Sequence, residues 1–170
     1  MSVPFPGATR PASSRTEVFL RYLAYFRDGV GRRVEAMSEE EARRSRVPSG
    51  WTPVELVRHL TFMERRWFVW GFEGEPVEDP YGDAVDGRWT VPDELATGEV
   101  LAAWRRQALA TEAVLRQHDL DEVGRPSPRW AGAAPPALER VVLHVLQEYA
   151  RHLGHLDVVA ELGGGVTGEV

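Results

Sequence analysis

The 170-residue chain contains no cysteine and no lysine. Without cysteine it cannot form a disulfide framework or a cysteine-ligated zinc ribbon, and it has no thiol nucleophile of its own. All 20 basic side chains are arginine, and 26 acidic side chains outnumber them, so the formal net charge is −6. This acidic balance argues against nucleic acid as a partner.

Long apolar runs are also missing. No stretch approaches the 18 consecutive apolar residues typical of a membrane-spanning helix, so no membrane partner is expected. Residues 1–13 lack the apolar centre of a signal peptide, and we interpret them as a disordered N-terminal lead-in. Residues 14–170 are long enough, and apolar enough, for one domain with a sizeable core. The cytoplasm is the expected location.

Four long segments carry apolar residues at helical spacing, which predicts an all-α protein. They are residues 15–37, 53–71, 98–117 and 139–162. Each of Ser14, Ser38 and Thr52 stands three positions before a glutamate, which is the spacing of a capping box at a helix start. Thr97 is expected to cap the third long helix. The capping-box spacing at Ser38 also predicts a short helix between the first two long ones.

The connections over residues 74–92 and 119–136 are long and rich in proline and glycine. No strand is predicted in either connection. The pattern therefore predicts a four-helix bundle with long connections, in which simple up-down packing is not assured. Long loops in small domains are often functional, and the first connection is also acidic.

The last helix carries two polar residues on its apolar stripe. At about 100° per residue, Glu148 and His152 lie on one face, one turn apart, where a bundle helix normally carries leucine or valine. A buried carboxylate and imidazole are costly unless they are paired or bind a metal. His59 also lies on an apolar helix face. We therefore infer that His59, Glu148 and His152 converge on one metal ion, the alternative being an ion pair on a partly solvated face.

The remaining histidines receive other interpretations. His118 lies at the end of a helix, where a cation suits the helix dipole, so it is interpreted as structural. His144 lies one turn before Glu148, at the edge of the stripe, and is expected to have a polar partner. His155 follows His152 by less than one turn; it is a further candidate ligand, but a role in facing the substrate or supporting the site is favoured.

Three motifs, SGWTPVELVRHLTFMERRWF, EYARHLGHLD and LGGGVTGE, resemble the DinB-like superfamily. The most similar branch is DUF664, which is related to mycothiol-dependent maleylpyruvate isomerases and mycothiol S-transferases. The resemblance implies a DinB-like four-helix bundle with a divalent metal, zinc or nickel. It places the family's metal ligands at His59, Glu148 and His152. Glutamate at position 148 resembles the thiol-linked branch, since many other members carry histidine there.

These observations favour a metal-dependent thiol S-transferase. A divalent ion deprotonates a bound thiol, and a chain without cysteine must take that thiol from a cosubstrate such as mycothiol. His155 and Arg151 are the expected catalytic residues, which would orient a small-molecule substrate. A metal-dependent hydrolase and a non-catalytic metal-binding stress protein are the alternatives. The chain could also form a homodimer through its first helix or through the cluster Trp67–Phe68–Trp70, although a core position is favoured for both.

Overall fold

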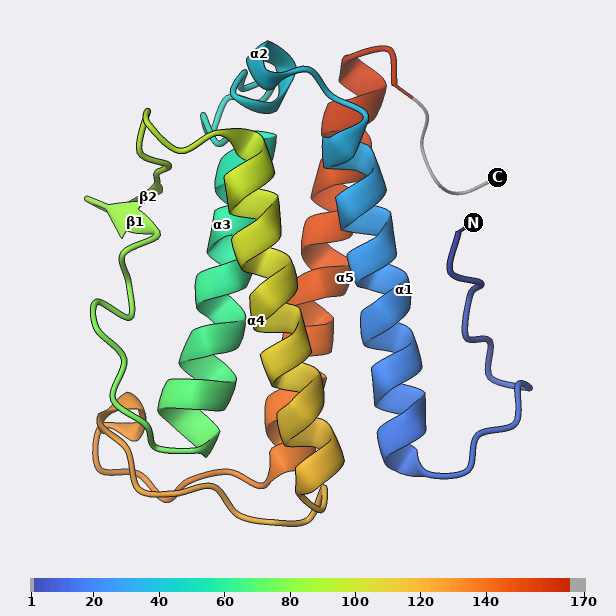
Figure 1. Cartoon of the computed structure of the whole chain (residues 1–170), viewed down its shortest axis with the longest axis vertical. Coiled ribbons are helices and arrows are strands. Elements are labelled where there is room, and N and C mark those ends of the chain that lie inside the picture. Colours follow the sequence, from blue (N-terminus) through green and yellow to red (C-terminus); the bar gives the residue numbers. More distant parts are fainter. Residues whose placement is uncertain (1, 166–170) are drawn as a thin grey trace.

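Four long helices packed side by side dominate the computed structural model, which describes residues 2–165 (Figure 1). They are α1 (Arg15–Glu35), α3 (Pro53–Glu64) with its π-helical continuation η1 (Arg65–Phe72), α4 (Thr97–Gln117) and α5 (Leu138–Leu162). The short elements are α2 (Glu39–Ala42), the 3₁₀ turn η2 (Pro128–Trp130) and the strands β1 (Ala84–Val85) and β2 (Arg88–Trp89). The prediction of an all-α bundle is therefore confirmed, apart from one small hairpin.

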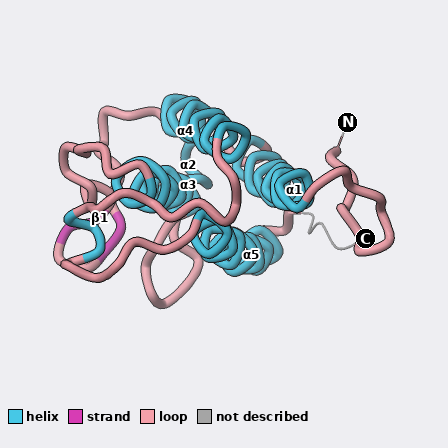
Figure 2. Tube along the Cα trace, turned by 90° about the horizontal axis from the view of Figure 1, so that it is seen from below, coloured by secondary structure: helices cyan, strands magenta, loops and turns pink. Residues whose placement is uncertain are grey.

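The bundle does not alternate up and down along the chain. Helices α1 and α5 run in one direction, whereas α3 and α4 both run in the other (Figure 1). Seen from below, the helices occupy four corners, and α3 lies next to both α4 and α5 (Figure 2). Because α3 and α4 are parallel, the segment between them must return along the full length of the bundle. That requirement explains the long connection in this part of the sequence.

The predicted helix starts are found at three of the four sites. Ser38 and Thr52 each form a complete capping box with the glutamate three positions later. Ser14 accepts a hydrogen bond from the backbone N–H of Glu17 at 3.1 Å. These caps satisfy N–H groups that the first helical turn leaves without partners.

The expectation for Thr97 was wrong. Thr97 is the first residue of α4, and Ala96 takes the capping position before it. The backbone N–H of Thr97 donates instead to the carboxylate of Glu39, at 3.1 Å from Oε2. The N–H of Ala96 donates to the carboxylate of Glu99 at 2.9 Å. A side chain of α2 therefore satisfies the first N–H of α4.

The apolar faces of the four helices meet in one core. Its fully buried members include Leu23, Val30, Leu56, Leu60, Phe68, Leu115, Val141, Val145, Tyr149 and Leu156. Gly29 allows α1 to lie close to α5, since a Cβ at this position would lie 2.9 Å from Leu153 Cδ2. The glycine that weakens α1 as an isolated helix therefore permits the contact that the bundle needs.

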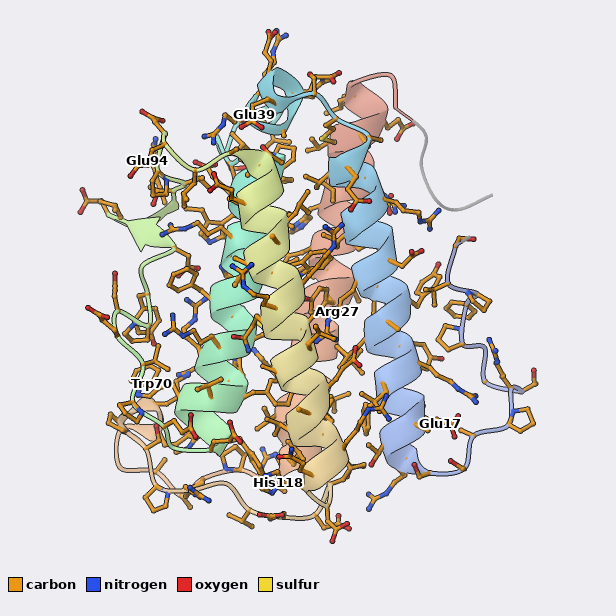
Figure 3. The ribbon with its side chains drawn as sticks, viewed as in Figure 1. Glu17, Arg27, Glu39, Trp70, Glu94 and His118 are labelled. Atoms are coloured by element: carbon orange, nitrogen blue, oxygen red, sulfur yellow. The ribbon has the colours of Figure 1, made fainter. Side chains whose placement is uncertain are left out.

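A polar cluster crosses the centre of this core, with one residue from each long helix. The carboxylate of Glu64 in α3 is fully buried and accepts hydrogen bonds from Arg27 of α1, Thr111 of α4 and Tyr149 of α5. Arg27 Nη2 lies 2.8 Å from Glu64 Oε2 (Figure 3 labels Arg27). Trp104 donates its indole N–H to the Tyr149 hydroxyl at 2.8 Å. A buried carboxylate with this many donors is well satisfied.

The N-terminal segment before α1 folds back against that helix. In the N-terminal segment, Phe5 makes edge-to-face contacts with Tyr22 and Tyr25 of α1, with ring centroids 6.1 and 5.2 Å apart. The disorder of residues 1–13 and the domain boundary at residue 14 stay predictions. After α5, Gly164 adopts the left-handed conformation, with φ of 76°, which glycine takes readily at the end of a helix. The rest of the LGGGVTGE motif, from residue 166, lies outside the described residues.

No helix within residues 2–165 combines the length and the apolar character needed to cross a bilayer.

Candidate metal centre

The structure brings His59, Glu148 and His152 together. His59 lies on α3, whereas Glu148 and His152 lie one turn apart on α5, the neighbouring helix. Each offers one ligating atom, and these atoms all lie within 4.8 Å of one another. The geometry is the one expected from the apolar stripes. Their role as metal ligands stays a prediction.

His152 is the most buried of the three, with 4% of its surface exposed. Burial and the nearby His59 lower its pKa to about 4, although the Glu148 carboxylate acts in the opposite direction. The ring is therefore neutral at pH 7, which is the form that binds a metal. Its Nε2 lies 3.1 Å from Glu148 Oε2. Its Nδ1 is buried and has no hydrogen-bond partner among residues 2–165.

Glu148 lies between two histidines of its own helix. His152 is one turn after it, and His144 is one turn before it, with Nε2 3.6 Å from Glu148 Oε1. The Glu148 side chain is 21% exposed, so it is less buried than the stripe suggested. His144 packs against the Trp67 ring at a centroid distance of 4.1 Å, and burial lowers its pKa. The expected polar partner of His144 is therefore Glu148.

His59 is supported by a residue that the sequence analysis missed. Its Nδ1 lies 2.9 Å from Asp83 Oδ2, and Arg66 Nη1 lies 2.6 Å from the other Asp83 oxygen. Burial acts to raise the pKa of Asp83, but the hydrogen bonds from His59 and Arg66 outweigh it, and the pKa lies below its usual value. The Trp89 ring stacks on the His59 ring, with centroids 4.2 Å apart and planes inclined by 20°.

Asp83 and Trp89 both belong to the β1–β2 hairpin, where no strand was predicted. The strands pair antiparallel, with Ala84 opposite Trp89. The turn is formed by Asp86 and Gly87, which have φ of 51° and 76°. Positive φ at both central residues is typical of the two-residue hairpin turn that Asp-Gly favours. The Asp86-Gly87 dipeptide is the sequence feature that could have indicated the hairpin. The strands were not predicted because each has only two residues.

A cavity of about 560 Å³ opens beside the three candidate ligands. Its other lining residues are Val47, Ser49, Trp51, Trp89, Arg151, His155 and Val158. His155 and Arg151, which were expected to act on the substrate, are both exposed on α5 and reach this cavity. The His155 ring lies 5.5 Å from the His152 ring and 6.3 Å from the Trp51 ring. The volume suits a small-molecule ligand, and the catalytic role of both residues stays a prediction.

Residues interpreted as structural lie away from this cavity. His118 follows the last turn of α4 (Figure 3), and its Nδ1 lies 2.9 Å from Glu122 Oε2. Phe68 is fully buried and Trp67 packs against Trp130, so these members of the aromatic cluster serve the interior. The homodimer stays a prediction.

The donor set fits a divalent ion. Two neutral imidazoles and one carboxylate are a ligand set of catalytic zinc sites, which keep a further position open. His59 presents Nδ1 to Asp83 and so keeps Nε2 available. His152 retains a buried nitrogen that the described protein groups do not satisfy. The residues present therefore match a metal such as zinc in both type and number.

Comparison with protein families matches residues 18–165 to the family described as mycothiol-S-transferase. A comparison with curated proteins found no match. Among solved structures, the fold is similar to that of a DinB-like protein from Bacillus cereus, with a TM-score of 0.62 and 17% sequence identity. The similarity covers 91% of this chain and 96% of that chain. At this identity it shows the fold alone, and it confirms the DinB-like four-helix bundle.

Proposed function

Because this chain belongs to the mycothiol-S-transferase family, we propose that it transfers a low-molecular-weight thiol of the mycothiol type to an electrophilic small molecule. The observation that carries the proposal is the group formed by His59, Glu148 and His152, whose ligating atoms lie within 4.8 Å of one another beside a cavity. A metal ion held by this group would be open to a substrate through the cavity that these side chains line.

The three side chains would hold one divalent ion, for which zinc is the first choice and nickel the second. When bound, the ion supplies positive charge that favours a thiolate over a thiol. Two neutral imidazoles and one carboxylate leave that charge near +1, so an anionic ligand is favoured at the open position. Since the chain has no cysteine, the sulfur comes from a cosubstrate. A free thiol cosubstrate implies a reducing compartment, for which the cytoplasm is the natural choice.

The transfer itself is a displacement. The thiol gives its proton to solvent, and its sulfur then attacks the electrophilic carbon. With an activated aryl chloride, a C–S bond forms while the C–Cl bond breaks, and chloride leaves with the bonding electron pair. Arg151 and His155, which line the same cavity, would orient the two reactants. Trp51 and Trp89 provide an apolar wall for the electrophile.

Cobalt substitution tests the proposal directly. Purified protein is stripped of metal, loaded with cobalt and titrated with mycothiol, then separately with glutathione. Coordination of sulfur to cobalt produces a charge-transfer absorption band, which mycothiol should induce at the lower concentration. Thioether formation from mycothiol and an activated aryl chloride is then followed by mass spectrometry. His118→Ala serves as a control, because this histidine pairs with Glu122 away from the cavity.

Two results would redirect the assignment. If neither thiol alters the cobalt spectrum but the metal-loaded protein cleaves an activated ester, a metal-dependent hydrolase replaces the transferase. If metal binds but neither reaction occurs, a non-catalytic metal-binding protein replaces it. A protein that binds no divalent metal contradicts the proposed site as well as the proposed activity.

A further inference from the structure

One hairpin holds the His59 imidazole from two directions. Asp83 comes immediately before β1 and meets the ring at Nδ1, at 2.9 Å. Trp89, the last residue of β2, covers one face of the ring. The backbone N–H of Thr90 donates to the Asp83 carbonyl at 2.9 Å, which closes the base of the hairpin. A contact at the edge and a contact on the face together fix the orientation of the ring.

The hairpin is itself tied to the helix that carries His59. Arg66 donates to both oxygens of Asp83, at 2.6 and 3.2 Å, and to the Pro80 carbonyl at 3.0 Å. Arg58 donates to the Thr90 carbonyl at 2.6 Å. Asp83 and Arg66 are 2% and 8% exposed, so their ion pair is shielded from water. Bidentate pairs of this kind fix geometry as well as supplying attraction.

We propose that Asp83 is a positioning residue, which keeps the His59 proton on Nδ1 and thereby presents the Nε2 lone pair to the space shared with Glu148 and His152. An ionised carboxylate accepts hydrogen bonds but has no proton to donate, so a neutral imidazole forms this hydrogen bond only in the tautomer with Nδ1–H. A carboxylate behind a ligating histidine fixes its tautomer and strengthens it as a ligand. The consequence for metal binding rests on the proposed function, whereas the tautomer itself does not.

The arrangement also makes metal binding depend on the packing of residues 73–96, the whole segment between η1 and α4, against α3. This segment supplies Asp83 and Trp89, and neither belongs to a long helix. If the hairpin leaves its place, His59 loses both contacts at once and its ring is free to turn. Binding of the ion should therefore slow hydrogen exchange of the Thr90 amide, which donates to the Asp83 carbonyl at the base of the hairpin.

Nitrogen-15 NMR of the metal-free protein tests the tautomer. At a pH where the imidazole is neutral, His59 should carry its proton on Nδ1, and Asp83→Asn should move the population toward Nε2–H. In parallel, zinc titration against a chromophoric chelator should give a dissociation constant about 10- to 100-fold higher for Asp83→Asn. Glu78→Gln is the matched control, because it removes one carboxylate from an exposed position of the same loop. It should bind zinc like the parent protein.

The outcomes separate the two ideas. A proton on Nε2 of His59 in the parent protein overturns the positioning role and needs no variant to fold. An unchanged zinc dissociation constant in Asp83→Asn overturns it as well, provided that circular dichroism shows a folded bundle. If the parent protein has the Nδ1–H tautomer but binds no zinc, the proposed function fails while the role of Asp83 in orienting His59 stands.

Discussion

The hydroxyl of Tyr149 donates a hydrogen bond to the carboxylate of Glu64, on the neighbouring helix, at the centre of the bundle. Tyr149 immediately follows Glu148 along α5, yet the two side chains serve different purposes. Glu148 faces the candidate metal site, whereas Tyr149 joins the buried cluster with Arg27 and Thr111. Burial raises the pKa of Tyr149 well above 10, so the phenol keeps its proton at physiological pH. One turn of α5 therefore contributes to both the site and the core.

Removing this hydroxyl should destabilise the fold. Tyr149→Phe leaves Glu64 with one donor fewer and the Trp104 N–H without its acceptor, so the free energy of unfolding should fall by about 1–3 kcal/mol. Glu64→Leu should cost more, about 3–5 kcal/mol, because it leaves the buried Arg27 without its main partner. Urea denaturation of the metal-free proteins measures both. Tyr81→Phe, at an exposed position, should change the free energy by less than about 0.5 kcal/mol.

Loss of one candidate ligand should remove the metal but keep the fold. His59→Ala deletes an imidazole from a partly exposed position, so the helices should stay assembled while zinc content falls below one tenth of the parent value. Elemental analysis of the purified variant, with circular dichroism for helix content, checks the expectation. His118→Ala should retain the parent zinc content. A zinc content in His59→Ala equal to that of the parent protein would show that zinc binds elsewhere.

Protonation of His152 at acidic pH should lower the free energy of unfolding of the metal-free protein. Its pKa is about 4 in the folded protein, against a usual value near 6.5, so the unfolded chain binds more protons between these two values. Stability therefore falls as the pH decreases through this range, by about 3 kcal/mol at most for this residue. Denaturation curves at pH 7, 6, 5 and 4 in the presence of a chelator measure the loss. His152→Leu should show a shallower pH dependence, since it lacks the titrating group.

The two exposed residues of the cavity should affect the reaction without affecting the metal. Arg151→Ala and His155→Ala leave His59, Glu148 and His152 in place, so zinc affinity should remain within about twofold of the parent value. The value of kcat/KM for thioether formation should fall about tenfold or more if these side chains orient the reactants. Arg140→Ala, on the same helix but outside the cavity lining, is the matched control. A variant that lost both zinc and activity would indicate a ligand-supporting role instead.

The helices and the three candidate ligands could be predicted because each depends on local pattern. Glu148 and His152 lie on one helix, where the fixed rotation per residue places both side chains on the same face. His59 could be selected because it is a polar residue on an otherwise apolar helix face. The caps at Ser38 and Thr52 follow from neighbouring residues in the same way. Such features need no knowledge of the tertiary fold.

Other features depend on contacts between distant segments, and these could not be predicted from local pattern. The hydrogen bond between Asp83 and His59 exists only because the hairpin folds back onto α3, and five acidic residues of that loop offered no reason to select Asp83. Thr97 does not cap α4 because the helix begins one residue earlier than expected, and its N–H is bound by Glu39 from a different helix. The π-helical continuation of α3 was missed since its apolar spacing gives a helical signal like that of an α-helix.

The placement of the candidate ligands has a consequence for how the protein is made. More than half the length of the chain separates His59 from His152, and the other two candidate ligands, Glu148 and His152, both lie on the last helix of the bundle. A ribosome that has released only α1 to α4 has produced His59 with its hairpin, but no second or third ligand. A chain at that stage lacks two of the three candidate ligands, so metal loading at this site should report that the final helix has docked.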